Sequence, residues 1–224
     1  SRSAFHLDNT KAFPENVEIE TLLTFSSSDP GRLVSGVAAN GNAITLRQHH
    51  SLVKLPDDNF RVRLADPRIG TSGPTIQDYS TGIDEDLQIR LVARHRLEKK
   101  DPNAARSEPE EPIVYYVDSG TPDPIKTALI EGASWWNQAF EAAGYINGFQ
   151  VKVLPEDVDP MDVRYNVIQW VHRSTRGWSY GSSVRDPRTQ EILKGHVTLG
   201  SLRVRQDYLI AEGLIVPYGE GDSI

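Results

Sequence analysis

The sequence predicts an α+β protein in which a β-rich N-terminal domain precedes a mixed sheet packed against one long helix. Three observations predict this class. Apolar and polar residues alternate in short runs over the first hundred residues, as in strands with one buried face. The second half contains one long apolar stripe with helical spacing, and further alternating runs follow that stripe.

Five runs in the N-terminal half are predicted to be strands. Turn residues separate them, such as Asp29-Pro30-Gly31 and Asn40-Gly41-Asn42, because Gly and Asn tolerate the positive φ of a tight reversal. The predicted strands are residues 17–25, 32–38, 43–55, 60–64 and 87–97. Residues 98–112 are polar and hold three prolines, so we expect a surface linker there. It would join a domain of residues 1–97 to a second domain of residues 113–224.

The second domain is predicted to begin with a strand at residues 113–117 and to continue with a helix. Asp123 is its expected N-cap, Pro124 its first residue and Gly144 its stop. Apolar residues recur every three or four positions between these ends: Ile125, Leu129, Gly132, Trp136, Ala139, Phe140 and Ala143. The elements predicted after the helix are strands at residues 149–154 and 163–172, a hairpin over residues 182–204, and a short helix at residues 205–213.

Composition argues against several classes of function. The net charge is −7, and the 24 basic residues are scattered, so we expect no nucleic-acid partner. No run of about 18 apolar residues is present, so we expect no membrane span. The absence of cysteine rules out disulfides, thiolate zinc sites and cysteine nucleophiles. Any metal would therefore be held by His, Asp or Glu.

The six histidines form no local zinc motif. None stands in H-E-x-x-H or at another i, i+4 spacing. His49 and His50 are adjacent in a predicted strand and would point to opposite faces. No zinc site is therefore encoded locally.

One segment fits the G-x-S-x-G pattern of serine hydrolases, with Ser179 at its centre. Asp186 and His196 follow in the chain order of a catalytic triad. The pattern requires a helix after the serine, but strand and turn residues follow Ser179 here. A serine hydrolase using Ser179 is therefore an alternative that the local sequence does not favour.

The second domain resembles the opening of a metzincin catalytic domain. The resemblance lies in residues 112–118, 135–144, 159–166, 170–174 and 195–201. Together they are similar to a family of large bacterial zinc-dependent metalloproteases, and the first domain resembles the region that precedes the protease domain in that family. The resemblance implies hydrolysis of peptide bonds by a zinc-activated water, a peptide or protein substrate, and a secreted or periplasmic protein.

In that family the zinc ligands and the general base lie on an H-E-x-x-H helix and on a segment downstream of it. None of these residues occurs here, so the resemblance implies an upper subdomain truncated before the zinc-binding helix. Zinc would belong to the complete protein, and this chain alone would be inactive. The alternative from a different class is a non-catalytic binding module on the same scaffold.

The resemblance also implies that the edge strand of the sheet binds the backbone of the substrate. By its position after the hairpin, residues 196–201 are predicted to be that edge strand. The predicted substrate-binding residues are Val197, Thr198 and Leu199 through their main chains, with His196 and Gly200 shaping access.

Overall fold

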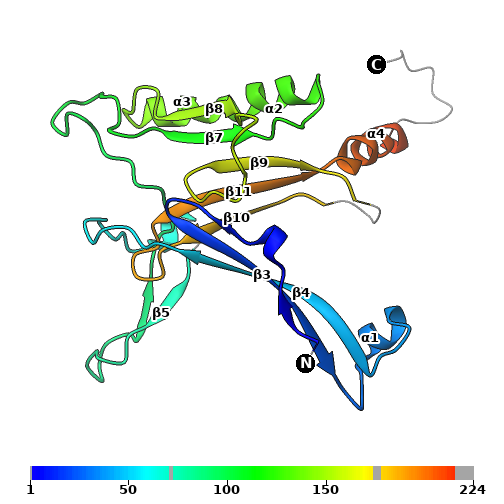
Figure 1. Ribbon diagram of the computed structural model, residues 1–224. Coiled ribbons are helices and arrows are strands. Elements are labelled where there is room, and N and C mark those ends of the chain that lie inside the picture. The colour runs from blue at the N-terminus through cyan, green and yellow to red at the C-terminus, as the bar shows by residue number, and fades with distance from the viewer. Residues whose placement is uncertain (1, 71–72, 174–177, 215–224) are drawn as a thin grey trace. The chain divides into compact units, whose positions relative to one another are not determined.

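The computed structural model describes residues 2–70, 73–173 and 178–214, and it confirms the α+β class (Figure 1). The chain divides into two compact units. The first unit is Ser1–Pro56 with Met161–Val163, and the second is Asp57–Pro160 with Arg164–Ile224. No helix in the described parts of the chain has the length and apolar character that crossing a membrane requires.

The first unit is built on a long antiparallel hairpin. Strands β3 (Asn16–Ser26) and β4 (Ala43–Val53) pair over their whole length, which confirms the predictions for residues 17–25 and 43–55. The short strands β1 (Ala4–Phe5) and β2 (Lys11–Ala12) also pair with β3, and the 3-10 turn η1 (Leu7–Asn9) lies between them in sequence. The result is a four-stranded sheet.

The strand predicted at residues 32–38 is wrong, because this segment forms the helix α1 (Arg32–Val37) in the hairpin connection. The amide N–H groups of Val34 and Ser35 both donate to the carbonyl of Gly31, which closes the first helical turn. The side chains of Leu33 and Val37 are exposed, so no sheet packs against them. Periodicity alone does not separate helix from strand in so short a run.

The predicted strand at residues 60–64 is also wrong. Phe60 is buried, with the guanidinium of Arg94 lying 4.4 Å from its ring centroid, so this apolar residue packs against a side chain instead of pairing in a sheet. The strand expected at residues 87–97 shortens to β6 (Gln88–Arg90), which pairs with β5 (Thr75–Gln77). The short 3-10 helix η2 (Pro67–Ile69) precedes β5.

The main sheet of the second unit has five strands in the order β10-β11-β9-β7-β8. Four of them run parallel, and β10 is antiparallel at one edge. The strands are β7 (Ile113–Val117), β8 (Phe149–Val153), β9 (Asn166–Val171), β10 (Tyr180–Arg185) and β11 (Ile192–Gly200). The helix α4 (Leu202–Leu214) follows β11. These elements confirm the predicted order of strand, helix, two strands, hairpin and final helix.

The predicted single helix of the second half is two helices, α2 (Ile125–Ser134) and α3 (Trp136–Ala142), which meet at Trp135. Pro124 is the N-cap, and Asp123 does not occupy that position as predicted. Gly144 ends the pair at a φ of +87°, which confirms the predicted stop.

Residues 98–112, predicted as a linker, lie within the second unit. Lys99 pairs with Pro109 in an isolated β-bridge, and the buried Ser107 pairs with Tyr145 in another. Backbone hydrogen bonds therefore hold this polar segment in a folded loop.

Candidate functional site

An apolar groove runs between the helices and the sheet of the second unit. Helix α2 packs on β7 and β8, and α3 packs on β8, as Figure 1 shows. The groove has a volume of about 480 Å³. Its helical wall consists of Ala128, Leu129, Gly132, Ala133, Trp136 and Phe140. Its floor on the sheet includes Tyr115, Ile168, Val197 and Leu199, so it extends over β9 and β11.

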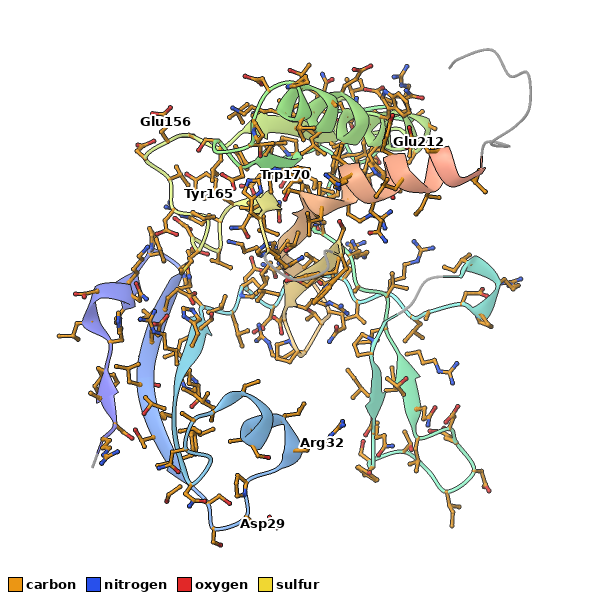
Figure 2. The ribbon with its side chains drawn as sticks, turned by 90° about the vertical axis from the view of Figure 1, so that its right-hand side faces the viewer. Asp29, Arg32, Glu156, Tyr165, Trp170 and Glu212 are labelled. Atoms are coloured by element: carbon orange, nitrogen blue, oxygen red, sulfur yellow. The ribbon has the colours of Figure 1, made fainter. Side chains whose placement is uncertain are left out.

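The pleat of β11 divides the five predicted site residues between the two faces of the sheet. Val197 and Leu199 line the groove. Because successive residues of a strand alternate, His196, Thr198 and Gly200 lie on the opposite face. Trp170, labelled in Figure 2, pairs with Leu199 in register and therefore shares the groove face.

His95 and Tyr115 form the polar end of the groove. The Nε2 atom of His95 lies 3.3 Å from the Tyr115 hydroxyl, and the two rings meet edge to face with centroids 6.0 Å apart. Burial lowers the pKa of His95 to about 4 and raises the pKa of Tyr115, so both side chains are neutral near pH 7. The groove is consequently uncharged even where it is polar.

The prediction that residues 196–201 form the edge strand is wrong. β11 lies inside the sheet: Val197 pairs with Gly181 of β10 and with Ile168 of β9, and Thr198 pairs with Tyr180 and Gln169. Their main-chain groups are thus engaged by neighbouring strands on both sides. The return strand of the hairpin inserts next to β9, so the first strand of the hairpin takes the edge.

The edge position belongs to β10 (Tyr180–Arg185). Within the described parts of the chain, β10 pairs only with β11, so its outer backbone N–H and C=O groups face away from the sheet. All of its residues except Ser183 are exposed. An extended peptide fits such an edge by adding one more strand to the ladder.

The structure does not assemble the serine-hydrolase triad. Ser179 Oγ accepts a hydrogen bond from the backbone N–H of Gly200 at 3.3 Å. His196 lies opposite Ser182 in register, three residues or about 10 Å along the strand from Ser179, and its Nε2 contacts Gln169 Oε1. The buried carboxylate of Asp186 accepts hydrogen bonds from the backbone and guanidinium of Arg188, which lower its pKa.

A second polar cluster lies on the hairpin of the first unit. The carboxylate of Glu18 is buried, accepts hydrogen bonds from Ser51 and Asn16, and lies 2.5 Å from Nε2 of His49. His49 faces Glu20 across the two strands, because these residues are directly opposite in register. Within the described residues no group of three or more His, Asp or Glu side chains is arranged to hold a metal ion. The cluster is a hydrogen-bonded link between β3 and β4.

This cluster predicts an acid-sensitive hairpin. Burial raises the pKa of Glu18, but the combined hydrogen bonds from Ser51, His49 and Asn16 lower it by more. The net result is a pKa below the usual 4.5. A lowered folded-state pKa means that the stabilisation is complete above about pH 4.5 and is lost as the pH falls below it. Glu18→Gln should therefore weaken the hairpin by about 1 kcal/mol near neutrality and reduce its response to acid.

Hydrogen–deuterium exchange of peptides from β3 and β4, corrected for the intrinsic effect of pH, measures this response. Glu15→Gln is the matched control, because Glu15 is an exposed carboxylate of the same unit, 3.5 Å from Lys54. Equal acid responses in the Glu18 and Glu15 variants would contradict the assignment.

Comparison with known protein families gives a match for the N-terminal part of the chain. Residues 1–100 match the family described as a domain of unknown function, DUF5117. No curated protein and no solved structure matches the chain. The match includes the whole β3–β4 hairpin and His95, whereas the five-stranded sheet lies outside it.

His95 and Tyr115 of the groove were not predicted as site residues, and the edge strand was predicted at residues 196–201 instead of at β10. His95 lies within the strand predicted at residues 87–97, and Tyr115 lies within the strand predicted at residues 113–117. The sequence does contain a sign of this role, because His95 is a titratable residue on the same face of the predicted strand as the apolar Leu91 and Leu97. No local pattern indicates that this face meets a tyrosine twenty residues later in the chain.

Proposed function

We propose that this chain is the scaffold of a zinc-dependent metalloendopeptidase, in which β10 binds the peptide substrate. The zinc ligands would come from a segment of the protein outside these 224 residues, as the resemblance to the metzincins implies. The observation that carries the proposal is that α2 and α3 cover the groove face of the sheet over β7 and β8, whereas the groove continues over β9 and β11.

The part of this face over β9 and β11 has the properties of a binding surface for a further helix. α2 and α3 pack on β7 and β8, while the groove continues over Ile168, Val197 and Leu199 of the neighbouring strands. An apolar sheet face requires a covering layer, and helices are the usual layer over a mostly parallel sheet. The wall of the groove is suited to a close neighbour because Gly132 carries no side chain and an added Cβ there meets nothing within 4 Å.

A zinc-binding helix seated in this groove would leave β10 as the edge that faces a substrate. The backbone groups of β10 would then hold an extended peptide through main-chain hydrogen bonds, while zinc would supply the activated water. The role of this chain in the reaction is to align the peptide and to exclude water from the covered face. The whole protein would act on peptides or proteins in a secreted or periplasmic setting.

Zinc content measured by elemental mass spectrometry tests the proposal on this chain and on a version extended by the native residues that follow. We expect about one zinc per chain in the extended version and none in the short one. Zinc in neither version would contradict the proposal and favour a non-catalytic binding module. Stoichiometric zinc in the short chain would contradict the placement of the ligands outside it.

A variant of the groove tests whether zinc binding depends on a helix packed there. Gly132→Leu fills the helical wall and should reduce zinc occupancy of the extended protein severalfold. Gly36→Leu is the control, because Gly36 also lies in a helix with no atom within 4 Å of an added Cβ but belongs to the first unit. Equal zinc occupancy in the two variants would show that the groove does not seat the zinc-binding segment.

A further inference from the structure

An arginine lies at one end of the edge strand β10. Arg173 follows β9, and its guanidinium lies 5.0 Å from the ring centroid of Trp178 and 5.8 Å from that of Tyr180. Its Nη1 donates a hydrogen bond of 2.8 Å to the carbonyl oxygen of Trp178. Within the described part of the chain, Arg173 forms no ion pair with a carboxylate. The guanidinium is therefore positioned by aromatic rings and a carbonyl, with its positive charge uncompensated there.

The carbonyl that holds this side chain lies against a glycine of β11. Arg173 comes from the end of β9 and reaches residues beside β10, and β11 lies between these two strands. At the crossing, a Cβ on Gly200 would lie 3.1 Å from the carbonyl oxygen of Trp178 and 3.5 Å from Nη1 of Arg173. Gly200 therefore leaves room for the carbonyl oxygen that accepts the hydrogen bond from Arg173.

The direction of β10 decides which part of a bound peptide meets the arginine. β10 runs from Tyr180 to Arg185, so a peptide that pairs with it antiparallel has its C-terminal part beside Tyr180. Tyr180 pairs with Thr198, and this pair lies on the face opposite the groove. The arginine thus lies next to the C-terminal residues of the peptide.

We propose that Arg173 binds a carboxylate in the C-terminal part of a peptide paired with β10, which gives the site a preference for acidic peptides. This inference rests on the proposed function for the idea that β10 binds peptides. A guanidinium offers N–H donors in a fork that matches a carboxylate. Stacking on Trp178 and Tyr180 holds the fork in place, so less side-chain entropy is lost when the carboxylate binds.

Fluorescence anisotropy with this chain and four labelled peptides tests the inference. All four have the same extended threonine and valine sequence, with Glu or Gln as the penultimate residue and a free or amidated C-terminus. We expect the peptides that carry the recognised carboxylate to bind about tenfold more tightly. A preference for Glu in amidated peptides identifies a side-chain carboxylate, and a preference for the free terminus in Gln peptides identifies the terminal one.

Variants connect the preference to the arginine. Arg173→Gln should abolish the preference, and Arg173→Lys should retain part of it. Arg185→Gln, which removes the arginine at the other end of β10, should leave the preference intact. No binding of any peptide, equal binding of all four, or equal losses in the Arg173 and Arg185 variants would overturn the inference.

This measurement needs no zinc, so its outcome is separate from that of the proposed function. Absence of zinc from the extended protein would contradict the peptidase while leaving a carboxylate preference of β10 standing. Zinc in the extended protein together with equal binding of all four peptides would support the peptidase and overturn the role of Arg173.

Discussion

The second unit is expected to lose stability as the pH falls from 6.5 to 4, and replacing His95 with glutamine is expected to abolish most of this loss. Burial lowers the pKa of His95 from 6.5 to about 4, so below pH 6.5 the unfolded chain binds a proton that the folded chain does not. The free energy of unfolding therefore falls as the pH falls through this window. Its total loss is about 3 kcal/mol, of which about 2 kcal/mol is reached by pH 5.

Tryptophan fluorescence during urea unfolding measures this effect in the relevant part of the chain. The four tryptophans, Trp135, Trp136, Trp170 and Trp178, all belong to the second unit. The free energy of unfolding would be compared at about pH 7.5 and pH 5 for the wild type, His95→Gln and His50→Gln. His50 is an exposed residue of β4 in the first unit, so its variant should keep the wild-type pH dependence. If His95→Gln keeps that dependence too, the buried neutral histidine is not its source.

Gly195→Ala is expected to destabilise the second unit by about 2 to 3 kcal/mol. Gly195 lies in β11 under the phenol ring of Tyr115, and an added Cβ would lie 1.9 Å from the Tyr115 hydroxyl oxygen and 2.6 Å from Cζ. The ring must move, which disturbs its contact with His95 and the floor of the groove. The same urea experiment at pH 7.5 gives the magnitude.

Two further variants identify the clash as the cause. Gly181→Ala is the matched control, because it changes a glycine of the partner strand whose added Cβ is 4.0 Å from the nearest atom, the carbonyl oxygen of His196. Tyr115→Val in combination with Gly195→Ala should cost less than the sum of the single changes, because the clashing ring is gone. Additive losses, or equal losses at Gly195 and Gly181, would show that Tyr115 does not require the glycine.

Local patterns account well for the secondary structure of the second unit. Strands β7, β8 and β9, the hairpin of β10 and β11, and the helix stop at Gly144 all lie where alternation and turn chemistry predict them. The same reasoning failed at residues 32–38 and 60–64. In the first case local hydrogen bonds formed a helix, and in the second Phe60 packed against Arg94. Short apolar runs carry little information about their partners.

The position of the candidate site depended on contacts that no local pattern specifies. The hairpin was predicted, but β11 rather than β10 was expected at the edge, and the two arrangements differ only in which strand pairs with β9. His95 and Tyr115 are twenty residues apart and meet only because their elements pack together. Arg173 contacts Trp178 and Tyr180 from the far side of β11, and Gly200 leaves room for the Trp178 carbonyl oxygen that accepts its hydrogen bond.

The sequence by itself determined the α+β class and the order of elements in the second unit, because hydrophobic period, caps and turns are properties of neighbouring residues. Only the tertiary structure decided which strand forms the edge, which side chains line the groove, and how far the helices cover the sheet. Strand order and helix coverage depend on the free energy of pairing and burial between distant segments, and many arrangements of the same strands satisfy the same local pattern.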